Sequence, residues 1–549
     1  MTPRPLRIRI RDSLGRIRTL SEGPDSYERL DEGASHSISR CSRPVLLLGI
    51  GPHPAQLLPL VRRLQPEDSS VFWLESPDFL DALHDAGATP ELPAGWRKID
   101  PAQAALLLPG LIRETSPIMF AYRQGRRLFP EFWGPLLALC LIPDGFSPEH
   151  AAPAAPPSVL LPGNASSLLH RELTQALEME GLSPVHLPDS SVSPSGNHVD
   201  LKEFFARLKR QRPSLFLSVN LRGLDPEGRV FHLLRAMGIP VCIWFVDNPW
   251  QILSSLRLPW WKDALLLTTD ATFLPELRAC GAANAEFMPL AASSFFLDPE
   301  PAILPPGIRV LFVGRSSFPG KDAFFAAAPR HAEREAEARA MLRRGERPDY
   351  HWWKRRIEEE QGKHIPSWPG HAAREAGRGT EELALNNRLM WLNEAASLGQ
   401  NGMPALELVG DEGWKNRLDA PAHFSPPVDY YAMLPALYRA APFTLDVTSL
   451  LLPGGLTQRH FDVWQAGGFL LTATGSGMDI FPPHLAAPIT LRRPGDLVLS
   501  IKHLEHSPAY KTELRTAWQN EISRNHLYRH RIRAIWEMAK KLDATSFRV

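Results

Sequence analysis

The sequence predicts an α/β protein with successive doubly wound, parallel-stranded domains. Three times a short, wholly apolar run passes into glycine and then into a helical pattern: "PVLLLGIGPH" at 44–53, "SVLLPGNASS" at 158–167 and "RVLFVGRSS" at 309–317. A strand that is apolar at every position fits a sheet covered on both faces, and glycine permits the tight turn into a helix. With 549 residues, the chain is also too long for one hydrophobic core.

Two proline-rich stretches divide the chain, "SPEHAAPAAPPS" at 147–158 and "DPEPAILPPG" at 298–307. Proline lacks the N–H group and clashes with the preceding turn, so neither stretch can continue a helix or a central strand. They predict an N-terminal α/β domain that begins with a hairpin around Asp12–Gly15, two later domains and a tail. The expected bounds are 1–150, 155–300, 305–505 and 506–549.

In the two later domains, apolar strand segments alternate with helical patterns of ten or more residues, which is typical of open parallel sheets. A charged helical insertion at 321–400 interrupts the third domain. We expect it to present a solvated face with Trp352 and Trp353 packed inward, and a partner-docking surface is the alternative. The expected strands lie in 158–163, 214–220, 240–249, 264–270, 285–291, 309–315, 405–410, 443–448 and 469–474.

Charge and composition argue against several classes of protein. Lys plus Arg is 61 and Asp plus Glu is 60, so a net charge of +1 gives no overall field for a nucleic acid or an anionic membrane. Four scattered cysteines form no disulfide framework, which fits a reducing, cytoplasmic setting. The longest apolar stretches are shorter than a membrane helix requires, so no integral membrane segment is expected.

Three segments carry a resemblance to a known family: "IPVCIWFVDNPWQIL" at 239–253, "LLTTDATFLPELRACGAANAEFMPLAAS" at 266–293, and "GGLTQRHFDVWQAGGFLLTATGSGMDIFP" at 454–482. Together they resemble the CgeB-like, spore-maturation-type glycosyltransferases of the GT-B fold over about 155–545. The resemblance implies two Rossmann-like domains facing across a cleft, the second binding a nucleotide sugar and the first presenting the acceptor. Residues 44–150 are weakly similar to the Rossmann-like part of bacterial flagellin-glycosylation accessory proteins.

The turn "LFVGRSSFPGKD" at 311–322 suits a nucleoside diphosphate. Gly314 permits close approach of the backbone, a helix N-terminus offers unpaired N–H groups, and Arg315 and Lys321 are expected to neutralise phosphate charge. The alternative is that both cations are solvated loop residues. The turn is not a Walker A loop, because no Ser or Thr follows the lysine.

The segment "LTQRHFDVWQAGG" at 456–468 is expected to supply further donor contacts on a helix that two glycines close. The resemblance implies that Asp462 accepts hydrogen bonds from ribose or sugar hydroxyls. Many retaining GT-B enzymes carry another acid eight positions earlier, but here that position is Gly454, which leaves retaining or inverting chemistry open. Alternatively, Asp462 caps the helix or pairs with Arg459. The expected donor residues here are Gln458, Arg459, Asp462, Gly467 and Gly468.

Polar residues that follow two strands of the second domain are candidates for catalysis. Asp247 lies just past "CIWFV", at the edge where sheet ligands bind, and could take the proton from an acceptor hydroxyl. Asp270 after "LLLTT" is a second candidate. For both residues the alternative is capping of the next helix. Gly163, Asn164 and Asn248 are expected on the acceptor side.

No tightly bound cofactor and no metal are expected, because no acidic pair or His/Cys cluster has metal-ligand spacing. The turn "GIGPHP" at 49–54 keeps only two glycines of a dinucleotide-binding loop, with Glu75 in the following strand region. We therefore expect a cytoplasmic, metal-independent glycosyltransferase that uses a nucleotide sugar and a glycan or protein acceptor. The alternatives are a GT-B-fold protein that binds a glycan or nucleotide without turnover, and a methyltransferase–glycosyltransferase fusion.

Overall fold

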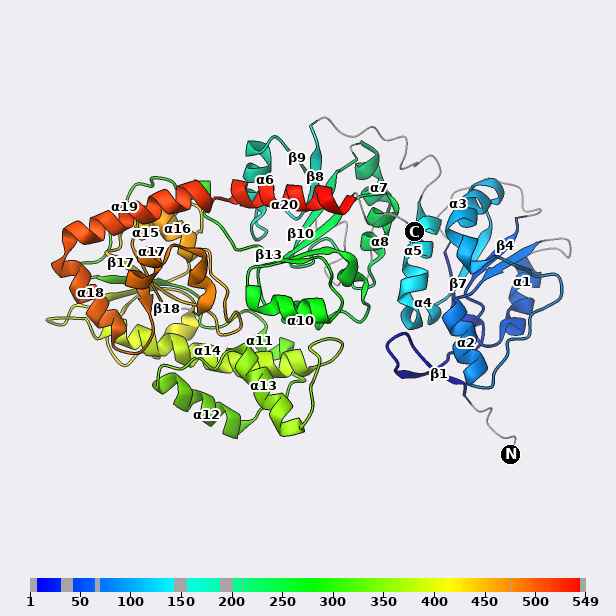
Figure 1. Ribbon diagram of the computed structural model, residues 1–549, viewed down its shortest axis with the longest axis horizontal. Coiled ribbons are helices and arrows are strands. Elements are labelled where there is room, and N and C mark those ends of the chain that lie inside the picture. Colours follow the sequence, from blue (N-terminus) through cyan, green and yellow to red (C-terminus); the bar gives the residue numbers. More distant parts are fainter. Residues whose placement is uncertain are drawn as a thin grey trace.

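The computed structural model describes residues 7–30, 43–64, 70–142, 156–187, 201–210, 212–473 and 475–543. Three sheets lie in a row along the long axis of the molecule (Figure 1). We call the parts that carry them the N-terminal unit (7–142), the middle unit (156–297) and the C-terminal unit (308–525). The expected fold class is confirmed, since two parallel doubly wound sheets follow a smaller α/β unit.

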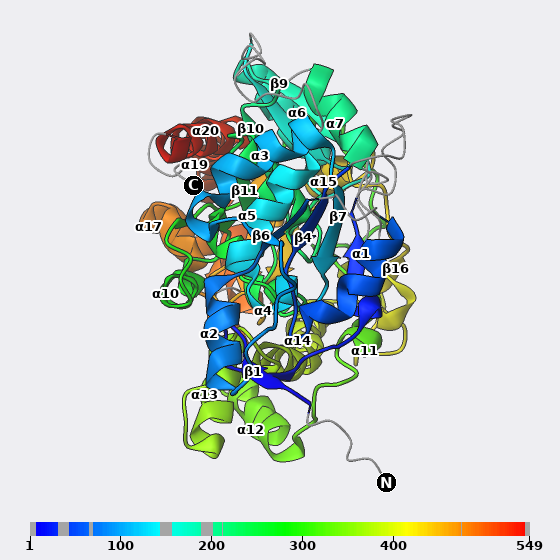
Figure 2. The ribbon, with the colours of Figure 1, turned by 90° about the vertical axis from the view of Figure 1, so that its right-hand side faces the viewer.

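The N-terminal unit contains a five-stranded sheet in the order β3-β7-β4-β5-β6 and a separate β1–β2 hairpin. Only β3 is antiparallel to its neighbour. In Figure 2, β4 lies between α1 and α5. The elements are β1 (Arg9–Arg11), β2 (Ile17–Thr19), β3 (Tyr27–Arg29), β4 (Val45–Leu48), α1 (Leu58–Leu64), β5 (Val71–Leu74), α2 (Pro77–Asp85), β6 (Arg97–Lys98), α3 (Ala104–Thr115), β7 (Ile118–Tyr122), α4 (Gly125–Leu128) and α5 (Pro130–Leu141).

The middle unit has six parallel strands in the order β13-β12-β11-β10-β8-β9. Its central strands are buried at every position, as expected for strands with helices on both faces. The elements are β8 (Ser158–Pro162), α6 (His170–Met179), β9 (Ser183–Leu187), α7 (Leu201–Arg210), β10 (Leu215–Val219), α8 (Arg229–Ala236), β11 (Val241–Phe245), α9 (Pro249–Leu253), β12 (Leu265–Thr268), α10 (Leu274–Ala279) and β13 (Ala285–Phe287).

The C-terminal unit has six parallel strands in the order β16-β15-β14-β17-β18-β19, with helices α11–α14 inserted between β14 and β15. The elements are β14 (Val310–Val313), α11 (Lys321–Phe324), α12 (Ala332–Arg343), α13 (Tyr350–Gln361), α14 (Ala372–Ala396), β15 (Leu406–Val409), β16 (His423–Ser425), α15 (Leu434–Ala440), β17 (Phe443–Val447), α16 (Arg459–Gln465), β18 (Leu470–Ala473), α17 (Pro483–Ala486), β19 (Thr490–Leu491), α18 (Asp496–His506), α19 (Pro508–Asn525) and α20 (Tyr528–Asp543).

Two connections tie the middle and C-terminal units together. The last helix, α20, returns to pack on α6, and Arg533 pairs with Glu180 (Figure 1, red). The inserted helices share an apolar core with the middle unit, in which Trp353 is buried against Gly379. The insertion therefore does more than present a solvated face: it joins the two units on one side of the sheets.

Candidate functional site

Both large sheets reverse strand order at one point, and in open α/β sheets ligands bind at such a point, outside the carboxyl ends of the strands. In the middle sheet the reversal lies between β8 and β10, and in the C-terminal sheet between β14 and β17. The two carboxyl edges meet. Asn248, after β11, donates from Nδ2 to the Leu451 carbonyl at 2.9 Å, and Asp270, after β12, accepts from the Gly454 N–H at 2.9 Å.

The polar groups of the turn after β8 form hydrogen bonds with residues of the turn itself and with Arg222. Gly163 has φ +114°, and a Cβ atom there would lie 2.8 Å from Ser167 Oγ and 3.1 Å from Arg222 Cδ. The Asn164 N–H donates to Ser167 Oγ at 3.1 Å, and Arg222 Nη1 donates to the same oxygen at 2.7 Å. Glycine is thus needed so that Arg222, which the sequence analysis missed, can cross the turn.

Asp247 is an exposed carboxylate at the middle-sheet edge. Asn220, at the end of β10, donates from Nδ2 to Asp247 Oδ2 at 2.7 Å and accepts from the Val246 N–H at 3.0 Å. Desolvation by the surrounding protein raises the pKa of Asp247, and the hydrogen bond from Asn220 acts in the opposite direction. An accessible carboxylate with a raised pKa, held by a bridging amide, is suited to take a proton.

Asn220 and Leu221 both adopt left-handed backbone conformations, with φ of +52° and +66°. Consecutive left-handed residues that are not glycine store strain, and such strain collects at functional sites. No pattern in the sequence marks this position, because Asn220 appears there only as the end of an apolar strand.

Asp270 and Asn248 are placed in the contact between the units rather than on an open surface. Asp270 is fully buried, caps the helical turn after β12 through the Thr272 N–H at 2.9 Å, and binds Gly454 with its other oxygen. Asn248 is 2% exposed and caps α9 through the Trp250 N–H. The capping alternative is therefore what the structure contains for Asp270. For Asp247 it is wrong, because the cap of α9 is Asn248.

The position of Gly454 explains why no acid stands there. An ideal Cβ on this residue would lie 2.9 Å from Asp270 Oδ1, so any side chain would displace that carboxylate. The carboxylate next to position 454 therefore comes from the middle unit.

The turn after β14 carries two basic residues at the carboxyl edge of the sheet in the C-terminal unit. Arg315 is exposed and makes no ion pair within the described residues, whereas Lys321 pairs with Glu382 at 3.3 Å. The Ser316 N–H donates to Asp411 Oδ2 at 2.9 Å, which fixes the turn. A pocket of about 430 Å³ adjoins it, lined by Ser316, Ser317, Phe318, Gly320, Lys321, Asp322, Ala323, Glu382, Leu385 and Arg417.

Arg347 is a further cation at this edge that sequence reasoning missed. It reaches from the insertion to Thr448 Oγ1 at 3.0 Å and to the Ala473 carbonyl at 3.4 Å, at the ends of β17 and β18. The local sequence "GERPDY" gives no signal, because the insertion brings this arginine to the edge only in the folded chain.

The two charged residues expected on α16 to contact the donor, Arg459 and Asp462, have different partners. Arg459 is bound to buried Asp446 and not to Asp462. Asp462 is 1% exposed and accepts from the Ser293 N–H at 2.9 Å and from the Tyr430 hydroxyl; its burial raises its pKa to about 8. Asp462 thus binds the connection between β13 and β14, which we call the linker, instead of facing an open surface.

The other α16 residues also serve packing. Gln458, at the start of the helix, interacts with Tyr528 of α20. Gly467, with φ +78°, and Gly468 end the helix next to Arg439 and the Tyr438 carbonyl, where a Cβ atom would clash. Because α16 runs back across the sheet to the start of β18, these glycines lie at the opposite edge from Arg315.

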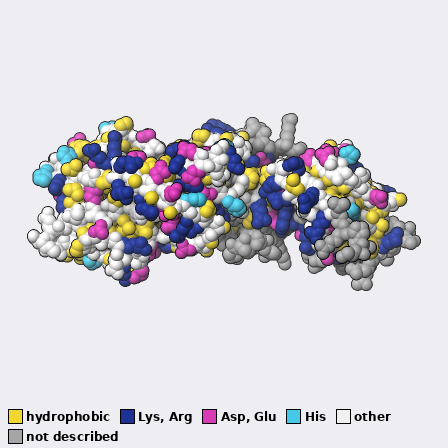
Figure 3. Space-filling model, turned by 90° about the horizontal axis from the view of Figure 1, so that it is seen from below, with side chains coloured by type: hydrophobic (Ala, Val, Ile, Leu, Met, Phe, Trp, Pro, Cys, Tyr) yellow, Lys and Arg dark blue, Asp and Glu magenta, His cyan; other side chains and the backbone are white. Residues whose placement is uncertain are grey.

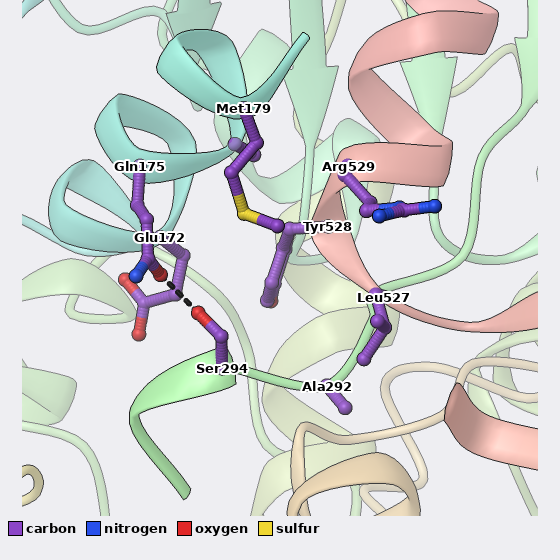
Figure 4. Close-up of a pocket in the computed structure, with 9 residues that line it drawn as sticks. Glu172, Gln175, Met179, Ala292, Ser294, Leu527, Tyr528 and Arg529 are labelled. Atoms are coloured by element: carbon purple, nitrogen blue, oxygen red, sulfur yellow. Dashed lines mark hydrogen bonds between the residues drawn. The ribbon is translucent and has the colours of Figure 1, made fainter. Parts of the chain in front are cut away.

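A small cavity of about 20 Å³ lies between α6, the linker and α20 (Figure 4), with room for about one water molecule. Gln175 and Ser294 are hydrogen-bonded across it, while Glu172, beside them, accepts from the Tyr431 hydroxyl at 2.9 Å. The Glu172–Tyr431 contact joins the middle and C-terminal units, and the cavity leaves no room for a substrate.

In the N-terminal unit, the "GIGPHP" turn is closed by Glu75. This fully buried carboxylate accepts from the Ile50 and Ser76 N–H groups, each at 2.8 Å, and burial raises its pKa to about 8. A Cβ atom on Gly51 would lie 2.5 Å from Tyr27 Oη. Both observations fit glycine used for packing, the alternative to a cofactor loop.

Among the described residues, no group of three or more His, Cys, Asp or Glu side chains is placed to hold a metal ion. The described helices also include none that is long and apolar enough to cross a bilayer. The expected metal independence and the role of each site residue stay predictions.

Residues 388–537 match a family model described as "Glycosyl transferase-like". This segment runs from the second half of α14 into α20 and includes β17, one of the two strands at the C-terminal switch point, but not β14 or the turn after it. No curated protein sequence matches the chain.

Solved structures similar to the chain include three glycosyltransferases. The spinosyn forosaminyltransferase SpnP is 14% identical and covers 71% of this chain and 99% of its own, with a TM-score of 0.32. The glycotransferase of kitacinnamycin is 14% identical over 70% and 98%, with a TM-score of 0.32. The lipopolysaccharide outer core galactosyltransferase WaaB, apo form, is 9% identical over 69% and 99%, with a TM-score of 0.33. These values are too low to transfer a substrate to this chain.

Proposed function

We propose that this protein is a glycosyltransferase that moves a sugar from a nucleotide-sugar donor to an acceptor hydroxyl. One observation carries the proposal: the carboxyl edges of two doubly wound sheets meet, with an exposed arginine, Arg315, on one edge and an exposed carboxylate, Asp247, on the other. Open α/β sheets bind their ligands at such edges. The family match to the C-terminal part agrees with a donor site there.

In the proposed reaction, the donor diphosphate lies against Arg315, Lys321 and Arg347, whose charge stabilises the departing nucleoside diphosphate. Asp247 accepts the proton of the acceptor hydroxyl as that oxygen bonds to the anomeric carbon and the bond to the diphosphate breaks. Asn220 keeps the carboxylate in place. We leave open whether configuration is retained or inverted.

We place the protein with the CgeB-like enzymes and in the cytoplasm, with a protein or glycan acceptor and no metal. Free Cys140 and Cys242, both buried, are in keeping with a reducing compartment.

A second candidate is a GT-B-fold protein that binds a nucleotide or glycan without turnover. It is supported by Asp462, whose oxygens are taken by Ser293 and Tyr430, and by the absence of an acid at Gly454. In this case nucleotide binding remains but no bond is broken.

The experiment that separates the two candidates screens full-length protein against a panel of nucleotide sugars. Thermal shift reports binding, and release of free nucleoside diphosphate reports turnover. We expect one donor to give both. Stabilisation by a donor without release, with acceptor extracts present, would favour the binding protein, and no response to any nucleotide would reject both.

A further inference from the structure

The β1–β2 hairpin carries a regular row of arginines. Arg7, Arg9 and Arg11 are exposed and alternate with Ile8 and buried Ile10, so the three arginines share one face. The pairing of Arg11 with Ile17 puts an isoleucine that is 62% exposed on that same face.

A second set of arginines continues this surface over α4. The Ser13 N–H donates to the Leu128 carbonyl at 2.9 Å, and the Gln124 side chain binds the Ser21 N–H and the Thr19 carbonyl. Figure 3 shows Lys and Arg side chains gathered at this junction. We call the combined surface the arginine face, defined by Arg7, Arg9, Arg11, Arg123, Arg126, Arg127 and Arg229. Arg18 and Arg16 lie opposite Ile10 and Asp12 and therefore belong to the other side of the hairpin.

The charge of this face is only partly compensated. Two carboxylates each serve two arginines: Glu28 pairs with Arg123 and Arg126, and Glu227 with Arg127 and Arg229. Within the described residues, Arg7, Arg9 and Arg11 have no acidic partner. The excess positive charge fits an anionic partner.

The outer edge of β1 offers backbone groups as well as charge. The Asp12 N–H donates to the Arg16 carbonyl and the Leu20 N–H to the Ile8 carbonyl, so residues 8 and 12 face β2. In an antiparallel pair the main-chain groups of Arg9 and Arg11 then point away from β2. They have no partner in the described part of the chain, and such an edge can accept another strand.

The arginine face adjoins the edge where we place the acceptor. The loop that begins with Asn220, beside Asp247, ends at Arg229 on this face. Leu14 of the hairpin and Leu221 of that loop both pack against the core of the middle unit.

We propose that the arginine face docks an extended, acidic polypeptide segment as a third strand on β1. Acids at every second position of an extended chain repeat about every 6.8 Å, which is also the spacing of Arg7, Arg9 and Arg11 along β1. The bound segment belongs to a protein acceptor whose hydroxyl reaches Asp247, and this last assignment rests on the proposed function.

Binding to full-length protein is measured by fluorescence anisotropy with a labelled peptide of six Glu-Thr repeats. We expect micromolar affinity at low salt that weakens as salt is added. The triple substitution R7E/R9E/R11E should weaken binding at least about tenfold. The matched control is R343E/R492E/R524E, which changes three exposed arginines of the C-terminal unit and should bind as the unsubstituted protein does.

The backbone component is tested with the same peptide N-methylated at every second residue, which keeps the charges but blocks strand pairing. We expect this peptide to bind at least about tenfold more weakly. Equal affinity for both peptides, or equal affinity for polygalacturonate at matched charge, would overturn a polypeptide partner. Unchanged binding by the triple variant would overturn the arginine face itself.

The docking surface and the proposed function can fail separately. Without a protein acceptor, the triple variant should still hydrolyse the donor to free nucleoside diphosphate at the unsubstituted rate, because none of its residues lies at the donor edge. Peptide binding in a protein that turns over no nucleotide sugar would keep the docking surface and remove its role in acceptor binding.

Discussion

The carboxyl edge of the N-terminal sheet and the edges of the two larger sheets are built from the same strand–glycine–helix pattern, yet they differ in access. At the N-terminal edge, Glu75 is fully buried and its oxygens bind the turn. At the other two edges, Asp247 and Arg315 are exposed. The buried groups at the N-terminal edge therefore stabilise the fold, whereas the exposed groups at the other two edges are available to bind a ligand.

The difference comes from residues distant in sequence. Tyr27 from β3 and Tyr122 from β7 lie against Gly51 and occupy the space in which a cofactor would approach the turn. At the turn after β14, Trp414 donates to the Gly314 carbonyl at 2.8 Å, yet Arg315 remains accessible. A glycine-rich turn therefore predicts a tight connection, while its surroundings decide whether it binds anything. Substitutions at the closed edge should affect stability, and those at the open edges should affect function.

The largest effect is expected for Gly51→Val at the closed edge. The new Cβ would lie 2.5 Å from Tyr27 Oη at a backbone φ of +63°. Clash and strain should together destabilise the N-terminal unit by about 3 kcal/mol or more, measured by denaturant unfolding with hydrogen exchange to locate the loss. Gly15→Val is the control, since Gly15 has φ +74° with no atom within 4 Å, and it should cost only about 1 kcal/mol. A Gly51→Val protein as stable as this control would show that the turn is open.

At the middle-sheet edge, Asp247→Asn should lower turnover on the order of 100-fold with little change in donor affinity, because a general base is lost. Steady-state kinetics and calorimetry with the donor measure the two quantities. Asp263→Asn, at an exposed acid of the same unit, is the control and should be fully active. Near-normal turnover in Asp247→Asn would remove the base from the proposal.

At the C-terminal edge, Arg315→Ala and Lys321→Ala should each weaken nucleoside diphosphate binding by about 1–3 kcal/mol, the loss of a charge-assisted hydrogen bond. Calorimetry measures the change, and Arg343→Ala, an exposed arginine on α12, should leave affinity unaltered. If both edge variants bind normally, the diphosphate lies elsewhere.

The closed edge should also give a pH dependence of stability. Burial raises the pKa of Glu75 to about 8, so the folded protein binds more protons than the unfolded chain between about pH 4.5 and 8. The free energy of unfolding should therefore fall as pH rises through this range, by at most about 1.4 kcal/mol per pH unit. Unfolding at pH 5 and pH 8 checks this, and Glu75→Gln should flatten the difference. If the free energy of unfolding rises between pH 5 and pH 8, and Glu75→Gln removes that rise, the pKa of Glu75 is not raised.

No effect is expected from a chelator, because Arg315, Lys321 and Arg347 offer the positive charge that a metal would otherwise supply to the diphosphate. Transfer assays with and without chelator test this. Activity that is lost and then restored by magnesium or manganese would show that the donor edge is incomplete without a cation.

The sequence predicted most of the buried strands, but it missed β7, which is central in its sheet and buried at every position. All three wholly apolar runs that end in glycine are strands: β4, β8 and β14. Other unforeseen strands, among them β9, β16 and β19, lie at sheet edges, where one side needs no hydrogen-bonding partner. Pro184 within β9 is tolerated for this reason. The segments 31–42, 143–155 and 188–200 lie outside the described residues, so the boundary expected at 147–158 is not tested.

By itself, the sequence determined which segments are strands, that the sheets are parallel, and that Asp247, Asp270, Gly314 and Arg315 follow strand ends. These properties depend on the local pattern of apolar residues and on glycine, so each can be predicted from one short segment of the chain. Only the tertiary structure decided that Asp247 is exposed, whereas Asp270 and Asp462 are buried and hydrogen-bonded between units. It also decided that Arg347 lies at the donor edge. The exposure of a side chain and its hydrogen-bonding partners depend on which distant chain segments pack together. The residue type and its local sequence therefore do not predict them.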